Sequence, residues 1–247
     1  VEQNRQIIVR QTEADPRRIQ KRDPYFIQIG FDFGTSYSKC ICRDVMTNKA
    51  WIYIPTGFDG RELPFLIPCS LRVREGRLGH LDNTKADYYA NGLYHLKQAL
   101  EKVALQQWND SALDPYRDYL GKGNVNGLGA FVQTCAVYFL SGVLGEIREN
   151  LRRRLLGFGT HENDYLAVHL AVPVADAERP EVNHLYQKIL CEAWVLADQL
   201  KGHPALDVAE VNKMIDELSD KRETMRNEAC HVYPETSANV QGFVRSR

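Results

Sequence analysis

A run of ten mostly apolar residues, YLAVHLAVPV at positions 165–174, restricts the fold of this chain more than any other stretch. Its length is that of a β-strand, and a strand with one face in water would instead alternate apolar and polar side chains. The run therefore predicts a strand that is covered on both faces. Helical patterns precede it at 131–156 and follow it at 180–200, and this order indicates an α/β sheet layered with helices.

The helical patterns carry terminal signals of their own. Residues 131–156 repeat apolar side chains at steps of three and four, collect arginines near their end and are followed by Gly157. A basic last turn and a glycine stop are typical of a helix C-terminus. Residues 180–200 open with a proline, which is favoured in the first helical turn. A third helical stretch, 207–228, loses its apolar stripe halfway, so we expect 201–230 to form a helical insertion at the surface.

Strand signals cluster in the first third of the chain. They cover residues 25–33, 37–45, 50–54, 63–73 and 77–81. Short turns separate the first three, which predicts an antiparallel meander. Weak helical character follows as far as the glycine-rich residues 121–129, so we expect 56–130 to be a subdomain inserted after the meander. The polar residues 1–24 predict a solvated N-terminal extension.

The composition excludes several classes of protein. A net charge of −1 gives no electrostatic reason to expect nucleic acid or an acidic membrane surface as a partner. No apolar run reaches the ~20 residues of a spanning helix, and the N-terminus lacks the apolar segment of a secretory signal. The six cysteines include no C-x-x-C spacing, so we predict reduced, buried thiols in a cytoplasmic protein, with disulfides or zinc as the alternative.

One stretch has the pattern of a ligand site, IGFDFGTSYSK at 29–39. A chain that reverses through Gly34, Thr35 and Ser36 presents several main-chain N–H groups beside two hydroxyls, and this arrangement suits phosphate oxygens. Asp32, at the end of the preceding strand, is placed to hold a hydrated metal ion against those phosphates. The structural alternative is a plain hairpin turn that Asp32 caps.

Other chemistry-bearing patterns are weaker. The glycines at 121–129 are not followed by the Gly-Lys-Ser/Thr ending of a Walker loop, and the motifs of dinucleotide-binding folds, zinc proteases and serine hydrolases are missing. His169 lies inside the apolar run. We expect it to be a core histidine with its hydrogen bonds satisfied rather than a catalytic base.

IGFDFGTSYSK resembles the first phosphate motif of the actin-like ATPases, most closely that of the seventy-kilodalton heat-shock chaperones. Three further segments resemble motifs of that family, in the family's order. They are GLYHLKQAL at 92–100, LAVHLAVPVADAERPEV at 166–182 and VYPETSANVQGF at 232–243. The resemblance implies a catalytic lysine at Lys97, an interlobe proline at Pro173 and a coupling glutamate at Glu235.

The resemblance also implies how these residues act. The amides of Gly34, Thr35 and Ser36 would hold the β- and γ-phosphates of ATP or ADP. Asp32 would act on Mg²⁺ through water, and Lys97 would orient the attacking water and offset phosphate charge. Lys97 is otherwise a solvated helix lysine. Lys39, beyond the turn, is either exposed or a second phosphate contact.

The implied fold is a ribonuclease-H-like lobe of the actin-like ATPase fold, with a mixed sheet, an antiparallel meander and flanking helices over residues 25–247. Two departures from the family stand out: the order Pro234-Glu235 is the reverse of the family's Glu-Pro, and no second phosphate loop or adenosine motif follows. We therefore interpret the sequence as the first lobe of a chaperone-like ATPase. Hydrolysis would need a second lobe, from the same native chain or from a partner protein, and a protein client is a further partner.

Two other functions remain open. The same fold could serve as a non-catalytic interaction or assembly module that retains the loop for structural reasons. A relative of the sugar or acetate kinases would need a polar substrate pocket after the first hairpin, and residues 55–90 contain no recognisable set of residues for one. The kinase alternative therefore ranks last.

Overall fold

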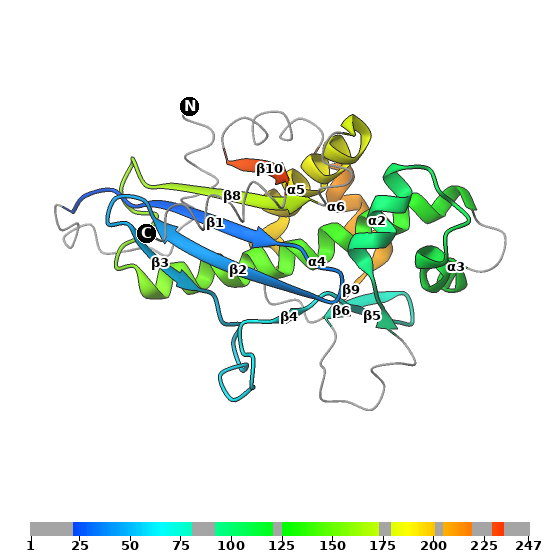
Figure 1. The fold of residues 1–247 in the computed structure, drawn as a ribbon, viewed down its shortest axis with the longest axis horizontal. Coiled ribbons are helices and arrows are strands. Elements are labelled where there is room, and N and C mark those ends of the chain that lie inside the picture. The colour runs from blue at the N-terminus through cyan, green and yellow to red at the C-terminus, as the bar shows by residue number, and fades with distance from the viewer. Residues whose placement is uncertain are drawn as a thin grey trace.

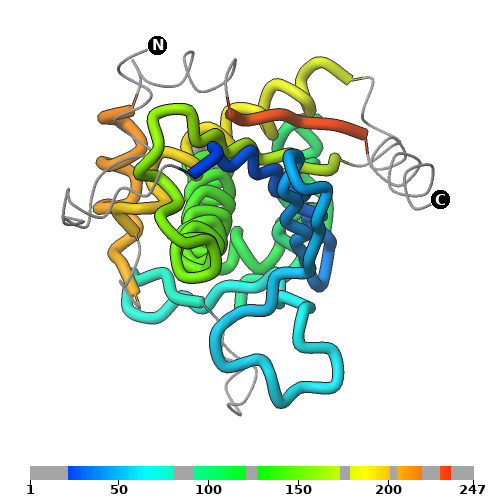
Figure 2. Tube along the Cα trace, turned by 90° about the vertical axis from the view of Figure 1, so that its left-hand side faces the viewer, coloured from blue at the N-terminus to red at the C-terminus, as the bar shows by residue number. Residues whose placement is uncertain are grey.

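The computed structural model describes residues 22–80, 92–120, 125–172, 179–200, 205–218 and 229–234. Figure 1 shows a large sheet in front of one long helix, α4 (Val125–Arg154), with a smaller sheet beside it. In Figure 2 the same helix is seen nearly end-on, and the other elements are arranged around it. The molecule is therefore a mixed α/β structure built on a central helix.

The large sheet has the strand order β10-β8-β1-β2-β3, and β4 pairs with β2 beyond the turn. Its strands are β1 (Phe26–Asp32), β2 (Tyr37–Asp44), β3 (Lys49–Ile52), β4 (Ile67–Pro68), β8 (Tyr165–Val172) and β10 (Cys230–Pro234). The first three form an antiparallel meander, whereas β8 and β10 run parallel to β1. The predicted meander and the predicted mixed sheet with flanking helices are both confirmed.

Parallel pairing brings three strand ends to one edge of this sheet. Asp32 at the end of β1 lies opposite Ala171 of β8, and Ala171 lies opposite Tyr233 of β10. The carboxyl ends of β1, β8 and β10 therefore meet at the same edge. In open α/β sheets such an edge is where ligands usually bind.

One face of the large sheet packs on helices. Along β1 the side chains of Ile27, Ile29 and Phe31 are buried, while the residues between them point to the other face. The alternation is that of a strand with one face in the core. Helix α5 (Pro180–Leu200) packs beside α4 on this side, and its bounds match the predicted helix.

Helix α4 begins earlier than the predicted 131–156, at Val125, and Gly127 and Gly129 of the predicted break lie within its first turns. Over Gly127–Arg154 it is long and apolar enough to cross a membrane, but 78% of its most apolar window is buried inside the molecule. Such burial is typical of a core helix. Gly157, with φ +73°, stops the chain just beyond it as predicted.

A second, antiparallel sheet has the order β7-β5-β6-β9. Its strands are β5 (Leu71–Arg74), β6 (Arg77–His80), β7 (Gly92–Leu93) and β9 (Ala205–Asp207). Three short helical elements, α2 (Leu96–Ala104), η3 (Ser111–Leu113) and α3 (Asp114–Leu120), follow β7. Residues 56–130 thus contain most of this sheet and the short helices beside α4.

The predicted surface insertion at 201–230 is more deeply embedded than expected. Its described part contains β9, which pairs with β6, and α6 (Val208–Asp216), which Asp207 caps by accepting a hydrogen bond from the Ala209 amide at 2.8 Å. Leu206, Val211 and Leu218 are buried in the common core. Because β9 pairs with β6, the described part of this segment belongs to the small sheet and is not a separate surface insertion.

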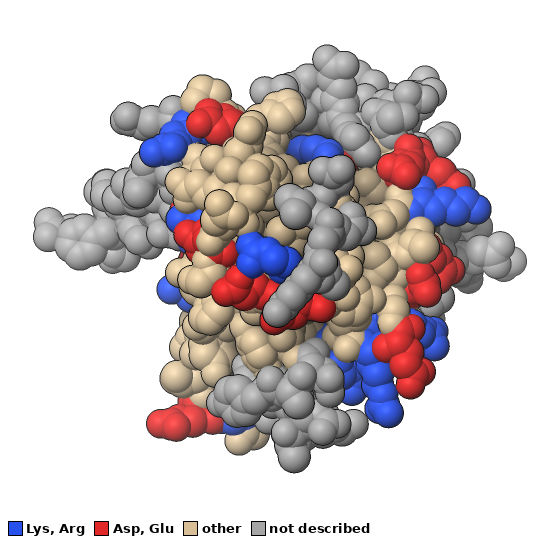
Figure 3. Space-filling model, turned by 90° about the vertical axis from the view of Figure 1, so that its right-hand side faces the viewer, with Lys and Arg blue, Asp and Glu red and all other residues tan. Residues whose placement is uncertain are grey.

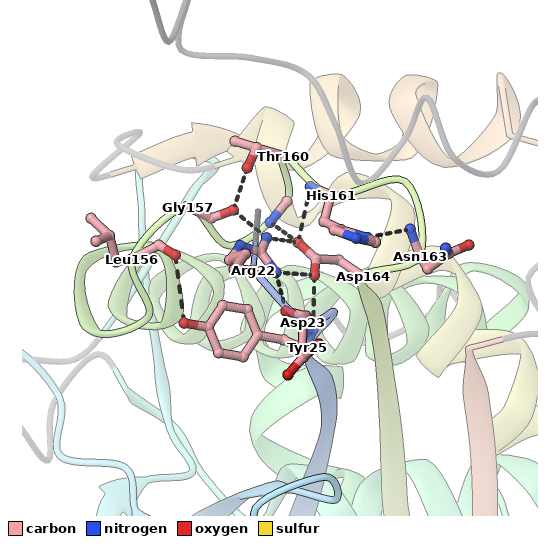
Figure 4. Close-up of polar contacts among 10 residues, drawn as sticks. Arg22, Asp23, Tyr25, Leu156, Gly157, Thr160, His161, Asn163 and Asp164 are labelled. Atoms are coloured by element: carbon pink, nitrogen blue, oxygen red, sulfur yellow. Dashed lines mark hydrogen bonds and ion pairs between the residues drawn. The ribbon is translucent and has the colours of Figure 1, made fainter. Parts of the chain in front are cut away.

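The amino ends of β1 and β8 are joined by a polar network around Asp164 (Figure 4). Its carboxylate is ion-paired with Arg22 and accepts hydrogen bonds from the amides of Tyr25, at 2.9 Å, and Gly159, at 2.7 Å. Arg22 also donates to the carbonyl of Gly157 at 2.5 Å. The sequence predicted that Arg22 belongs to a solvated arm. Its bonds to Asp164 and Gly157 instead hold it against the loop that enters β8.

All six cysteines are buried and free, so the prediction of reduced thiols is confirmed and the disulfide alternative is wrong. Among the described residues, no group of three or more His, Cys, Asp or Glu side chains could hold a metal ion, which also leaves the zinc alternative without a site there.

Candidate functional site

The reversal between β1 and β2 occupies residues 33–36, since β1 ends at Asp32 and β2 begins at Tyr37. A Cβ atom on Gly34 would lie 2.0 Å from the carbonyl oxygen of Tyr37. No other residue fits there without moving the backbone. The tight turn therefore requires a glycine at position 34 whether or not a ligand binds there.

The loop is held from one side and open on the other. The Cys69 amide donates to the Ser36 carbonyl at 2.9 Å, and β4 pairs with Tyr37 and Ser38. Within the described part of the chain, the amides of Gly34, Thr35 and Ser36 donate to no main-chain oxygen. Ser36 is exposed and Thr35 is half-buried. The amides that the sequence assigned to phosphate therefore have no main-chain acceptor among the described residues.

Asp32 and Lys39 lie side by side next to the loop. Their charged atoms are 3.2 Å apart, and the side chains are 42% and 50% exposed. Because the two residues are paired across β1 and β2, they point to the same face of the sheet. An exposed pair of this kind is weak and exchanges readily with other ions. Asp32 is accessible to a hydrated cation, and Lys39 is accessible to an anion.

Lys97, in the first turn of α2, is only 7% exposed, and its main-chain carbonyl accepts a hydrogen bond from the Tyr186 hydroxyl at 3.1 Å. It is therefore not the solvated helix lysine of the alternative interpretation. Its charge acts on Cys69, the residue that anchors the loop. Burial raises the pKa of the Cys69 thiol to about 12, the hydrogen bond with Ser38 and the charge of Lys97 act to lower it, and Asp32 acts to raise it.

The contacts around the loop bring together parts of the chain that are distant in sequence. The loop and Asp32 come from the first hairpin, and Cys69 comes from the segment after β4. The Ser38 hydroxyl lies 2.8 Å from the Cys69 thiol and completes the buried support beneath the turn. Sequence reasoning missed Cys69 and Ser38, because a buried thiol and hydroxyl carry no pattern that distinguishes them from ordinary core residues.

The donor set decides what kind of metal ion this site could hold. Asp32 offers one carboxylate, and the loop adds the hydroxyls of Thr35 and Ser36. A site with a full set of protein ligands does not fit, as no cluster of three acidic, histidine or cysteine side chains occurs among the described residues. Mg²⁺ that keeps most of its water and shares phosphate oxygens does fit a single carboxylate.

Two predicted site residues, Pro173 and Glu235, lie outside the described residues. The residues just before them, Val172 and Pro234, end β8 and β10 at the same sheet edge as Asp32. A surface groove opens near this edge, between the start of α5 and the end of β10. It is lined by Pro180, Glu181, Asn183, His184, Gln187, Val232 and Pro234.

The prediction for His169 is wrong in one respect. Its ring is only half-buried, and its Nε2 atom is buried without a hydrogen-bond partner in the described part of the structure. The ring stacks instead on His231, at 5.1 Å between centroids, and on Tyr233, at 5.4 Å. The residue is therefore not a satisfied core histidine.

Among the described residues, the surface on the side of α2 and α3 carries no single-sign patch (Figure 3). Figure 3 shows this face, with basic and acidic side chains interspersed among uncharged ones. A nucleic-acid surface would instead gather Lys and Arg on one side. The view agrees with the net charge of −1.

No family model matches the chain, and neither the comparison with curated proteins nor the comparison with solved structures gives a match.

Proposed function

We propose that this chain is the ATP- and Mg²⁺-binding lobe of a chaperone-like ATPase of the actin-like fold, working in the cytoplasm. The proposal rests on the resemblance of four segments to that family and on the shape of the large sheet. An antiparallel meander followed by two parallel strands, with helices packed on one face, is what a ribonuclease-H-like lobe predicts.

The observation that carries the proposal is the loop of residues 33–36, whose amides have no main-chain acceptor among the described residues and which has Asp32 and Lys39 beside it. Lys97 of α2 is buried, and its charge, like that of Asp32, acts on the pKa of the Cys69 thiol, whose amide binds the loop. Open amides, a neighbouring acid and a buried lysine are the parts that phosphoryl-transfer sites use to position and stabilise phosphate oxygens. A plain hairpin turn needs none of these charges.

Each residue then has a definite role. The amides of Gly34, Thr35 and Ser36 bind the β- and γ-phosphates. Lys39 provides a second cationic contact on the exposed side, and Lys97 offsets phosphate charge from the buried side. Bound Mg²⁺ would neutralise phosphate charge, with Asp32 holding it through water. ATP hydrolysis would require a second lobe, and Pro173 and Glu235 would couple the two lobes.

One observation favours a second function, the non-catalytic interaction module. Asp32 is ion-paired with Lys39, so the loop is charge-balanced without a ligand. A lobe that kept the fold for assembly with a partner would need no more than this. Binding of nucleotide separates the two functions.

The test is a titration of the ¹⁵N-labelled chain with Mg²⁺-ATP and with Mg²⁺-pyrophosphate, followed by amide chemical shifts. We expect weak, saturable shifts at Gly34, Thr35 and Ser36, with a dissociation constant on the order of 1 mM, because one lobe supplies only part of the contacts. Lys97→Met should weaken binding about tenfold or more, which corresponds to ~1.4 kcal/mol.

Lys49→Met is the matched control, because Lys49 is an exposed lysine on β3 of the same sheet and lies away from the loop. It should bind like the wild type. Shifts that are lacking in both titrations, or that are unchanged by Lys97→Met, would overturn the nucleotide proposal and leave the interaction module.

A further inference from the structure

Two imidazoles that the proposed nucleotide site does not use lie next to one another on the large sheet. His169 of β8 and His231 of β10 are in register on adjacent parallel strands, so both side chains project from the same face. Their ring centroids are 5.1 Å apart, and the ring planes differ by 25°. Both rings are half-buried rather than enclosed in the core.

The two imidazoles have no hydrogen bonds within the described residues that a metal ion would have to displace. Neither ring takes part in a hydrogen bond among the described residues, and Nε2 of His169 is buried without a partner. Burial and the neighbouring His231 lower the pKa of His169 to about 4, so this imidazole is neutral at physiological pH. A neutral imidazole with no hydrogen bond to break is the form in which histidine binds metals.

We propose that His169 and His231 form a chelating site for one divalent ion of the zinc and copper type, with one nitrogen of each ring as ligand and water in the remaining positions. Imidazole is the ligand that Zn²⁺, Ni²⁺ and Cu²⁺ favour, whereas Mg²⁺ favours oxygen. The site is separate from the proposed nucleotide site in both ligands and metal preference.

The geometry allows chelation with small movements. Strands in register hold the two Cα atoms about 4.8 Å apart. Two imidazole nitrogens on one tetrahedral Zn²⁺, each at about 2.0–2.1 Å, lie about 3.3 Å from each other. Rotation about the Cβ–Cγ bond, which is a soft torsion in histidine, turns the stacked rings toward a common point. The backbone of β8 and β10 need not move.

Space for the water ligands lies on the next strand. Gly30 of β1 is opposite His169, is exposed and has no side chain. Among the described residues, a Cβ atom built on it meets the carbonyl oxygen of Ile41, at 3.8 Å, and no other atom within 4 Å. With two protein ligands and no cluster of three among the described residues, the site should bind more weakly than a structural zinc centre.

The experiment is calorimetric titration of untagged chain with ZnCl₂ at pH 7.5, beside His169→Gln and His231→Gln. We expect one saturable site in the wild type and at least a tenfold loss of affinity in each variant. His184→Gln, on α5, is the matched control and should bind as the wild type does. MgCl₂ at the same concentrations should give no heat from this site.

A second experiment uses only the wild-type chain, so its result does not depend on whether the variants fold. Added Cu²⁺ should broaden the imidazole NMR signals of His169 and His231 in the wild-type chain before those of His161 or His184. Saturable Zn²⁺ binding that survives both Gln variants, broadening that begins at other histidines, or no binding by the wild type would each overturn the proposal.

Discussion

At the scale of single residues, Asp164 joins the segment before β1 to the loop that enters β8. Its side chain is 1% exposed, and its partners come from before β1 and from the loop that enters β8 (Figure 4). Burial alone would raise its pKa, but the hydrogen bonds from Arg22, Tyr25 and Gly159 and the charge of Arg22 lower it below the ordinary 3.8. The carboxylate therefore stabilises the fold in its charged form.

Asp164→Asn should lower the free energy of unfolding by about 2–4 kcal/mol at pH 7, because it leaves Arg22 without its counter-charge. A carboxyl whose folded pKa is depressed contributes its full stability above its unfolded pKa and loses it as pH falls through the folded value. The difference between wild type and variant should thus shrink below about pH 4. Urea unfolding at pH 7 and pH 3 measures both effects.

Asp23→Asn is the control, since Asp23 is exposed and meets Arg22 only through its main-chain carbonyl. It should change stability by less than about 0.5 kcal/mol at either pH. An Asp164→Asn variant with the same pH profile as the wild type would contradict the stated role.

At the scale of elements, the small sheet is fixed to α4 by a close contact between β6 and the helix. The His80 ring stacks on Tyr138, at 5.3 Å between centroids, and lies 6.1 Å from Phe139. Gly142, one turn further along α4, leaves the room that this ring occupies. A Cβ atom there would lie 2.2 Å from Nε2 of His80. A side chain at this position of α4 would force the exposed ring of His80 to move away from the helix.

Gly142→Ala should therefore destabilise the chain by about 1–3 kcal/mol through overpacking, although alanine ordinarily gains up to about 1 kcal/mol over glycine in a helix. In a His80→Ala background the same change should become neutral or stabilising. Thermal unfolding of the wild type, the two single variants Gly142→Ala and His80→Ala, and the double variant provides the measurement. A Gly142→Ala chain that is more stable than the wild type with His80 present would refute the contact.

The elements show what local sequence patterns could and could not predict. Helix α5 and the first meander were predicted almost to the residue, because each has a clear period and clear end signals. Strand β9 was missed because it has three residues and is stabilised by pairing with β6. Of the candidate site, the motif indicates the loop and Asp32, and Lys97 enters only through the resemblance, while the support from Cys69 depends on tertiary packing.

At the scale of the whole molecule, both sheets and the long helices share one hydrophobic core. Buried residues of β1, of β6 and of α5 belong to the same cluster, and α4 contacts both β6 and α5. No described part of the chain has a separate core of its own. The inserted residues 56–130 should therefore not unfold independently.

We expect urea to unfold the chain in one cooperative transition. Trp51 on β3, Trp108 after α2 and Trp194 in α5 report on three regions of the structure. Variants that keep one tryptophan each should give the same midpoint by fluorescence as the wild type gives by far-ultraviolet circular dichroism, after correction for the substitutions. An earlier transition at Trp108 alone would show that the short helices form a separate unit.

The parallel pairing of β1 with β8 has a consequence for the nascent chain on the ribosome. The partner of β1 is translated about 140 residues later, which is on the order of ten seconds at common elongation rates. Until then, β1 has only β2 to pair with, and its other edge is open to any extended peptide nearby. During synthesis there is therefore a period in which the unpaired edge of this hairpin can bind other extended peptides. Slow codons between β3 and β8 should lengthen that period.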